Sequence, residues 1–313
     1  MNYNIRYIFG EKSGFYKANL HSRSCLSDGK LSPEELKKLY KENGYSVLAI
    51  TDNEPMSQKN LSDKDFLVLS GFDFGVKSNE AINKSATFTA VSLNETPAPV
   101  KKFDAEYGSD KINFFLKEYK ENGYFITYDH PIRSLQTMPE FIGYEPIDAM
   151  EIMNYSSICE GYDEYNGFTY DLFNRYDKKI YCIATDANRN ERPLDDPRSD
   201  SFGAFTVINA DSLDYKSIAK ALSEGSFYSS EAPEIKAIWI KGDSLNVRCS
   251  PADRIVLSAG RRAVRCFYKN ENAPLTAATF KISPDDVYIR ITVIDEEGKR
   301  AYTNTYYTDD LLK

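Results

Sequence analysis

Along the first two thirds of the chain, short apolar runs alternate with longer stretches in which apolar residues recur every three or four positions. The apolar runs have the length of buried strands, and the amphipathic stretches predict helices. Strands are expected at 45–50, 66–69, 124–128, 147–153, 179–184 and 203–208. Because these strands are apolar on both faces and the connections are short, the order predicts a parallel sheet covered by helices, an α/β fold.

The helices are expected after Ser32 and at 110–122, 163–176 and 213–224. The first has the clearest boundaries. Ser32 can cap its N-terminus, Pro33 suits the first turn, and Glu35 completes a capping box. Asn43-Gly44 then supplies a left-handed stop.

Polar residues follow several of the predicted strands at their C-terminal ends. They form the segments Thr51-Asp52-Asn53, Ser70-Gly71-Phe72-Asp73, Asp129-His130-Pro131 and Thr185-Asp186-Ala187-Asn188. This placement favours a barrel-like α/β fold whose site lies at the C-terminal ends of the strands. Glu151 lies inside a predicted strand, and it points either into the mouth of the barrel or into a salt bridge.

The pattern changes after Pro233. Residues 234–313 read as short alternating strands with no helix of any length, and Lys241-Gly242-Asp243 and Glu296-Glu297-Gly298 resemble hairpin turns. We therefore expect two domains, a barrel at 1–232 and a small antiparallel, sandwich-like β domain at 233–313.

Composition narrows the classes of partner. The formal net charge is -8, from 39 Lys and Arg against 47 Asp and Glu, and no basic run stands out, so a nucleic-acid partner is not expected. No apolar run approaches the length of a membrane helix, which argues against a membrane partner. The five cysteines are scattered without metal-site spacing, and the first ten residues show no apolar stretch of signal-peptide length. These features favour a cytoplasmic protein.

Six short motifs, in order along residues 15–235, resemble the PHP (polymerase and histidinol phosphatase) family. They are Asn19-Leu-His-Ser-Arg23, Ser27-Asp-Gly29, Ile50-Thr-Asp-Asn53, Gly71-Phe-Asp73, Asp129-His-Pro131 and Ala184-Thr-Asp-Ala-Asn188. The resemblance implies a PHP-type (β/α)7 barrel that holds two or three divalent cations and hydrolyses phosphate esters. Such cations lower the pKa of a bound water and neutralise charge on the phosphoryl group.

The sequence departs from the family pattern at positions that normally bind metal. Arg23 and Asn53 stand where the family has histidines, and Asp73 replaces a longer glutamate. A further histidine is replaced near Thr87, and the last one is absent, with Asn188 or Arg189 in its place. The whole chain has two histidines.

The family's allocation of ligands implies a reduced metal site here. His21, Asp73 and Asp186 would hold one cation, Asp73 and His130 would be remnants of the second, and Asp28 would remain of the third. One divalent cation (Zn, Mn, Mg or Fe) is then the most that the residues allow, and none binds if Arg23 replaces it. His130 can also be a hydrogen-bonded histidine at a strand end.

Arg23 has three readings, because a guanidinium cannot bind a metal and stays protonated. It can neutralise the carboxylates of Asp28, Asp73 and Asp186 as an internal replacement for metal charge. It can clamp a phosphate or sulfate. It can also point into solvent. Arg189, Arg192 and Arg198 lie in a loop, 188–200, that either covers the site or is solvated.

Three functions follow from these readings. The chain is a pseudoenzyme that keeps a pocket for a small anionic or phosphorylated ligand. Alternatively, it is a one-metal phosphoric ester hydrolase in which Arg23, His130 and Asp28 take part in catalysis. In the third reading it is a non-catalytic scaffold that binds a partner through its aromatic-rich β domain.

Overall fold

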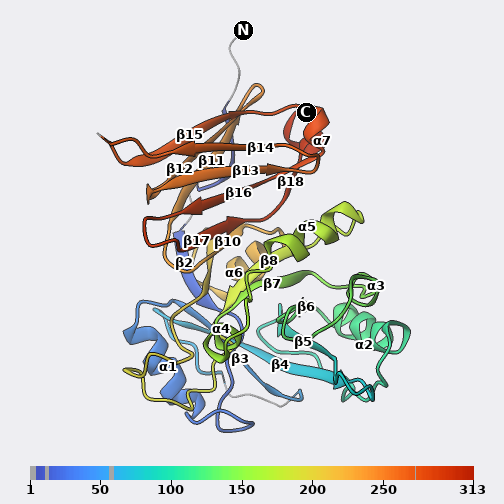
Figure 1. Ribbon diagram of the computed structural model, residues 1–313. Coiled ribbons are helices and arrows are strands. Elements are labelled where there is room, and N and C mark those ends of the chain that lie inside the picture. The colour runs from blue at the N-terminus through green and yellow to red at the C-terminus, as the bar shows by residue number, and fades with distance from the viewer. Residues whose placement is uncertain (1–4, 11–13, 56–59, 272) are drawn as a thin grey trace.

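The computed structural model describes residues 5–10, 14–55, 60–271 and 273–313. The chain folds into two parts that Figure 1 shows one above the other. The N-terminal two thirds, with most of the helices, lie below, and a stack of antiparallel strands from the C-terminal third lies above.

The N-terminal part alternates strands and helices over most of its length. Its strands are β2 (Gly14–Asn19), β3 (Val47–Asn53), β4 (Leu67–Lys77), β5 (Ser85–Ser92), β6 (Tyr124–Tyr128), β7 (Ala149–Asn154), β8 (Tyr181–Thr185), β9 (Phe205–Ala210) and β10 (Phe227–Ser230). Its helices are α1 (Pro33–Glu42), α2 (Ser109–Glu121), α3 (Met138–Phe141), α4 (Tyr155–Glu160), α5 (Gly167–Arg175) and α6 (Tyr215–Ser223). The helix expected at 163–176 is thus shorter than predicted, and α4 was not anticipated.

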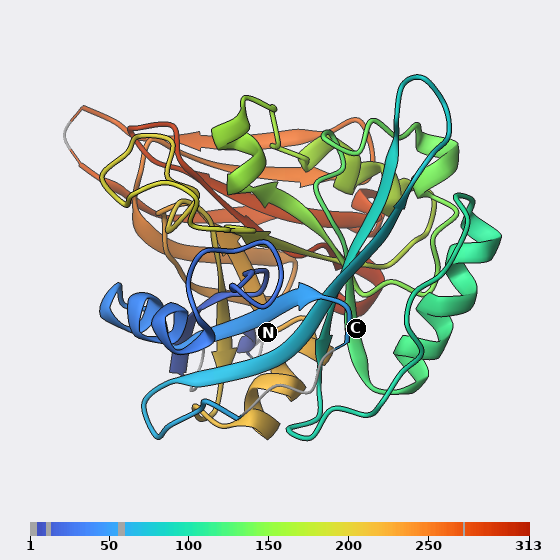
Figure 2. The same ribbon diagram turned by 90° about the horizontal axis from the view of Figure 1, so that it is seen from below.

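The sheet of this part is mixed. Strands β2, β3 and β4 pair in parallel, as do β6, β7 and β8. Strand β5 is antiparallel to both β4 and β6, and β9 is antiparallel to β2 and β10. The regular alternation expected from the sequence therefore fails between β4 and β6, because β4 turns directly into β5. Figure 2 shows this hairpin projecting beyond the rest of the molecule.

The sheet curls so that its last strand, β8, comes to lie beside β9 and β10. β8 ends the hydrogen-bonded order β10-β9-β2-β3-β4-β5-β6-β7-β8. Side chains join it to β9 and β10: Ala184 N donates to Thr206 Oγ1 at 3.2 Å, and Ser229 Oγ donates to the Cys182 carbonyl at 2.9 Å. The C-terminal ends of β2, β3, β6, β7 and β8 thereby face a shared space.

Helix α1 begins and ends where the sequence indicates. The Ser32 side chain accepts a hydrogen bond from the Glu35 backbone, and Glu35 reaches back to the cap residue. The helix buries Leu36 and Tyr40 in an apolar cluster with residues of β3 and β4. This packing fixes the loop that leads from β2 into the helix.

The C-terminal part is an antiparallel sandwich. Its strands are β11 (Ile235–Lys241), β12 (Ser244–Ala252), β13 (Arg254–Ala259), β14 (Val264–Tyr268), β15 (Leu275–Lys281), β16 (Tyr288–Ile294), β17 (Arg300–Thr303) and β18 (Tyr306–Tyr307), with one-turn helices η1 (Pro284–Asp286) and α7 (Thr308–Leu311). One sheet is β1-β11-β12-β15, and the facing strands are β14-β13-β16-β17. Apolar side chains of both sheets form one buried cluster between them. Both expected hairpin turns are present, and Gly242 and Gly298 take positive φ values there of 61° and 85°.

The two parts share strands. β1 (Ile5–Phe9) comes from the start of the chain and pairs with β11 in the C-terminal part, and β17 pairs with β10. A buried ion pair adds to the junction, with Arg290 Nη2 3.1 Å from Asp171 Oδ2 of α5. The division at 232/233 stays a prediction, and the structure adds that β1 lies with the C-terminal strands.

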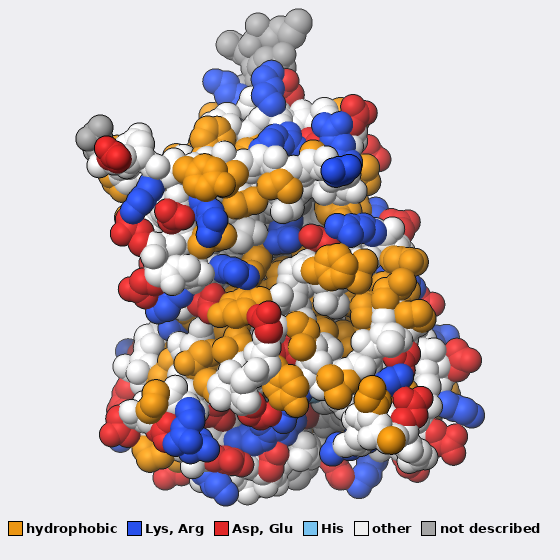
Figure 3. Space-filling model, in the orientation of Figure 1, with side chains coloured by type: hydrophobic (Ala, Val, Ile, Leu, Met, Phe, Trp, Pro, Cys, Tyr) orange, Lys and Arg blue, Asp and Glu red, His pale blue; other side chains and the backbone are white. Residues whose placement is uncertain are grey.

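The surface carries charges of both signs, as the 39 basic and 47 acidic residues of the sequence imply. On the face shown in Figure 3, apolar side chains gather in the band where the two parts meet, while charges of both signs are spread over the rest. None of the helices in the described residues has the length and apolar character needed to span a bilayer.

Candidate functional site

The loop at residues 20–29, which follows β2, is held in place by hydrogen bonds to Asp52 near the end of β3. Ser24 donates to the Asp52 carboxylate from its backbone N and its Oγ, at 2.8 and 2.6 Å, and Ser27 Oγ donates to Asp52 Oδ1 at 2.6 Å. Gly29 closes the loop tightly, since a Cβ atom there would lie 2.2 Å from a backbone oxygen across the loop. The side chains of this loop are therefore held in fixed positions.

His21 lies between two buried carboxylates. Its Nδ1 is 2.8 Å from Glu151 Oε1, and its Nε2 is 2.8 Å from Asp73 Oδ2. Burial alone would lower the pKa of His21, but the charges of Asp73, Glu151 and Asp129 outweigh it and raise the pKa to about 10. At neutral pH both ring nitrogens therefore carry protons, and His21 acts as a buried cation.

Arg23 adds a second buried cation to the same carboxylate. Its Nε donates to Asp73 Oδ2 at 2.6 Å, and its Nη1 donates to Asp28 Oδ2 at 2.8 Å. Arg189 Nε donates to the same Asp28 oxygen at 2.9 Å. Although burial opposes ionisation of Asp73, His21 and Arg23 lower its pKa well below the usual range. The structure thus brings together the Arg23, Asp28 and Asp73 side chains. Asp186, the third carboxylate of the charge-replacement reading, is hydrogen-bonded elsewhere, and the replacement of metal charge stays a prediction.

Asp129, at the end of β6, is a site residue that the sequence interpretation did not select. Thr89 Oγ1 lies 2.9 Å from Asp129 Oδ2 and 3.0 Å from Asp73 Oδ1. Burial, with further contributions from Glu151 and Asp73, raises the Asp129 pKa well above its usual value. Asp129 Oδ1 is buried without a hydrogen-bond partner among the residues that the structure describes.

His130 turns away from this cluster. Its backbone takes a positive φ of 31°, its backbone N donates to Glu151 Oε2 at 2.8 Å, and its Nδ1 lies 3.2 Å from Ser134 Oγ. Burial lowers the pKa of His130 to about 4, against the attraction of Glu151. The imidazole is neutral, and it lines a cavity above the cluster. The reading of His130 as a hydrogen-bonded histidine therefore describes its place in the structure.

Glu151 is buried and forms a salt bridge with His21, which is one of the two readings given to this residue. Thr185 Oγ1 donates to Glu151 Oε1, and Asn154 Nδ2 donates to Oε2 at 2.6 Å. Burial works against its charge, but His21 lowers the pKa of Glu151 below the usual range. Glu151 thus connects the ends of β7 and β8 to His21.

Asp186 lies apart from the cluster, which departs from its expected place beside His21 and Asp73. Its Oδ1 accepts hydrogen bonds from the backbone N of Gly203 and Ala204, at 3.0 and 3.1 Å. Its Oδ2 accepts from Phe202 N at 2.9 Å and from Tyr40 Oη at 2.7 Å. Burial raises its pKa to about 6. Both oxygens are therefore used to hold the loop before β9, and metal binding by Asp186 stays a prediction.

The other positions at which the family pattern has histidines lie in different parts of the site. Asn188 is buried, its Oδ1 accepts from Asn19 Nδ2 at 3.0 Å, and the same oxygen lies 2.8 Å from Tyr40 Oη. Asn53 and Thr87 instead line the cavity. The amide at 188 thus stabilises the floor of the site, where a histidine was expected from the family pattern.

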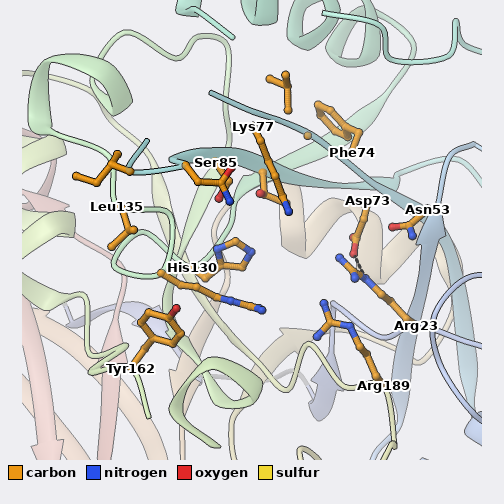
Figure 4. Close-up of a pocket in the computed structure, with 16 residues that line it drawn as sticks. Arg23, Asn53, Asp73, Phe74, Lys77, Ser85, His130, Leu135, Tyr162 and Arg189 are labelled. Carbon is orange, nitrogen blue, oxygen red and sulfur yellow. Dashed lines mark hydrogen bonds and ion pairs between the residues drawn. The ribbon is translucent and has the colours of Figure 1, made fainter. Parts of the chain in front are cut away.

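The cavity above the cluster has a volume of about 630 Å³ and is rich in cations. Its lining includes Arg23, Lys77, Arg133 and Arg189, and Asp73 is the carboxylate among its lining residues. Figure 4 shows Lys77, Arg189 and Arg23 pointing toward the same space, with His130 between them and Leu135 and Tyr162. Such an arrangement suits an anionic ligand.

The loop 188–200 was expected either to cover the site or to be solvated, and its arginines differ in this respect. Arg189 lies over the site and lines the cavity, together with a neighbouring cavity of about 560 Å³. Arg198 is exposed and pairs with Asp196 at 2.9 Å, and Arg192 lies 3.7 Å from the same carboxylate. Part of this loop therefore covers the site, and part is solvated.

Within the part of the chain that the structure describes, one set of residues could hold a metal ion. A nitrogen of His21 and carboxylate oxygens of Asp73 and Asp129 all lie within 4.8 Å of one another. Imidazole and carboxylate donors suit one divalent cation such as Zn²⁺ or Mn²⁺. Binding requires a neutral His21, whereas both its nitrogens are protonated toward carboxylates. The donors thus fit one cation in type and position but not in their state of protonation.

Comparisons with known proteins give distant structural likenesses. The chain is similar to a two-domain protein from Bacteroides vulgatus ATCC 8482 that contains a predicted PHP-like metal-dependent phosphoesterase, with 13% identity over 98% of this chain and 90% of that one, and a TM-score of 0.48. It is also similar to a candidate metal-dependent phosphoesterase from Bifidobacterium adolescentis ATCC 15703, with 10% identity over 58% of this chain and 93% of that one, and a TM-score of 0.38. No family model and no curated protein matches the sequence. These neighbours are of the class that the sequence motifs resemble, and the case for a function rests on the geometry of the site.

Proposed function

We propose that this chain is a PHP-type protein in which an internal charge network replaces the metal centre, and that it binds a small phosphorylated ligand without hydrolysing it. The curled sheet is then a distorted form of the (β/α)7 barrel. The observation that carries the proposal is the position of Arg23, whose guanidinium contacts Asp73 at 2.6 Å beside His21. We also propose a cytoplasmic location, which the five free cysteines support.

The charges of this network balance without a metal ion. Its cations are His21, Arg23 and Arg189, and its ionised carboxylates are Asp28, Asp73 and Glu151. The pKa of the fourth carboxyl group, Asp129, is raised well above its usual value. Leaving Asp129 aside, three positive charges meet three negative charges, so these pairs are balanced without a divalent cation. A guanidinium also cannot bind and acidify a water molecule as a metal ion does, which removes the usual nucleophile of a metal-dependent hydrolase.

The cavity retains what is needed to bind an anion. Lys77 adds positive charge beyond the balanced network, and both Lys77 and Arg133 line the cavity with Arg23 and Arg189. Arg133 is paired with Glu160 at 2.9 Å near the rim, so Lys77 is the cation best placed to interact with a ligand alone. Arginine suits the planar, paired recognition of phosphate oxygens.

The first experiment measures the binding of inorganic phosphate to chelator-treated protein by isothermal titration calorimetry. We expect binding in the absence of metal, weakened about threefold by Lys77→Gln, since Lys77 is exposed and its charge is screened. Lys64→Gln, which removes an exposed charge outside the cavity, serves as the matched control. Elemental analysis of the untreated protein should find less than about a tenth of an equivalent of metal. Failure of phosphate to bind would contradict the proposal.

A second candidate, a one-metal phosphoric ester hydrolase, is favoured by one observation. Asp129 Oδ1 is buried without a partner among the described residues, and it lies in the group with His21 and Asp73. These three side chains would hold the cation, which would supply a Lewis acid for the phosphate. Titration with Zn²⁺ separates the candidates. The hydrolase requires tight binding that Asp129→Asn abolishes, whereas the charge network predicts little binding in either protein.

A further inference from the structure

The cavity has an apolar end opposite its cationic end. Ile82, Leu135 and Tyr162 line it, and their side chains remain 59, 47 and 38% exposed. They come from three separate segments: the β4–β5 hairpin, the loop after β6 and the loop after α4. Figure 4 shows Leu135 and Tyr162 on one side of the cavity and Arg23 and Arg189 on the other.

Single exposed apolar side chains are ordinary on a protein surface, but this convergence is different. Three such side chains meet at the rim of a cavity whose other wall carries arginines. A cavity of about 630 Å³ that combines cationic side chains with these three apolar ones has room for a small organic ligand. Its two ends match a ligand with one anionic and one apolar part.

The backbone conformation of Leu135 is a second observation that supports a ligand-binding role for this wall. Its backbone takes a positive φ of 56°, which is unfavourable for a residue with a Cβ atom and is normally left to glycine or asparagine. The surrounding turn holds this conformation, with Leu135 N donating to the Ile132 carbonyl and Ser85 N donating to the Ser134 carbonyl. The strained backbone presents a leucine side chain that is half exposed and gains little from packing in the protein itself.

We infer that the ligand of this cavity is a phosphate monoester with a compact apolar organic group, of the aryl phosphate class. The phosphate lies toward Arg23, Arg189 and Lys77, and the organic group lies against Leu135, Tyr162 and Ile82. This inference rests on the proposed binding of a phosphorylated ligand and specifies which class is bound. A sugar or polyol phosphate would gain less from contact with Leu135 and Ile82, because its hydroxyl-bearing part buries little apolar surface.

The test compares three probes by isothermal titration calorimetry: phenyl phosphate, glycerol 3-phosphate and inorganic phosphate. We expect phenyl phosphate to bind about tenfold more tightly than glycerol 3-phosphate, as burial of a small apolar surface predicts. Leu135→Gly removes the side chain at a backbone position that glycine tolerates, so it should fold and should reduce this preference to about threefold or less. Ile132→Ala truncates an exposed apolar residue of the same loop that does not line the cavity, and it should leave the preference unchanged.

The outcomes separate this inference from the proposed function. If glycerol 3-phosphate and inorganic phosphate bind as well as phenyl phosphate, the apolar end does not select the ligand and the inference fails, while anion binding stands. If phenyl phosphate is preferred but Leu135→Gly keeps the full preference, the assignment to this wall is wrong. If none of the three probes binds, the proposed function fails, and the inference fails with it.

Discussion

The two histidines of this chain should hold opposite charge states at neutral pH, and a pH titration tests the charge network directly. His21 is charged because Asp73, Glu151 and Asp129 together overcome its burial, which raises its pKa to about 10. His130 is neutral because its burial outweighs the attraction of Glu151 and lowers its pKa to about 4. The perturbation is a change of pH between 4 and 10.

The pKa shifts fix the sign and size of the effect on stability. A pKa of about 10 for His21, against 6.5 for a free histidine, corresponds to ~5 kcal/mol of stability. This contribution is fully present below pH 6.5 and is lost as the pH rises toward 10. A pKa of about 4 for His130 corresponds to ~3 kcal/mol. It is fully present above pH 6.5 and is lost as the pH falls toward 4. Both contributions are therefore present together only near neutral pH.

The assay is nuclear magnetic resonance of protein labelled with ¹⁵N in histidine, which reports the protonation of each ring nitrogen. The chain has only two histidines, so assignment needs one variant, His130→Gln. We expect one imidazole with both nitrogens protonated and one neutral imidazole throughout pH 5.5 to 8. A His21 signal that titrates near pH 6.5, or that is neutral at pH 7, would refute the reasoning, because His21 would then be in the state that a metal ligand requires.

Two further predictions concern stability measured by urea denaturation at pH 7. Arg23→Met removes one of the two cations that pair with the buried carboxylate of Asp73 and should lower the free energy of unfolding by about 1.5–3 kcal/mol, the range for a hydrogen bond to a charged group. Lys38→Met, which breaks an exposed pair with Glu42 at 3.9 Å, should change it by less than about 0.5 kcal/mol. A similar loss in both variants would show that Arg23 is not a structural cation. Leu135→Gly should raise stability by about 1 kcal/mol through relief of backbone strain, and a decrease would show that the leucine is not strained.

Much of the fold follows from local pattern, and its departures come from contacts that the pattern does not contain. The capping box at Ser32 and the turns at Gly242 and Gly298 depend on neighbouring residues, so the sequence identifies them. Strand β5 was not recognised from the sequence. Most of its residues are small, and burial of both its faces removes the alternation of polar and apolar positions. Its place is decided by antiparallel pairing with β4 and β6, which no periodicity along the chain records.

In the site, too, some features follow from the local sequence and others depend on distant contacts. The grouping of His21, Arg23 and Asp73 follows from polar residues at the ends of neighbouring strands, and the structure brings them together. Asp129 was passed over in favour of the adjacent His130, which the family's allocation of ligands selects, and the positive φ of His130 has no signal in the sequence. The binding of Asp186 by backbone N–H groups at 202–204 comes from an irregular loop, which has no pattern to read.

Metal binding at this site would work against both internal cations, and this argues for the charge network over the hydrolase. At pH 7 a cation at His21 would have to displace a proton from a group with a pKa of about 10, which costs ~4 kcal/mol or about a thousandfold in apparent affinity. It would also have to move the Arg23 guanidinium from its contact with Asp73 Oδ2, or lie beside it against charge repulsion. A phosphate in the cavity meets neither obstacle, because it approaches Arg23, Arg189 and Lys77 from the open side and leaves the buried pairs intact. The ion pair of Arg23 with Asp73 therefore supports the proposal that this cavity binds an anion and not a metal ion.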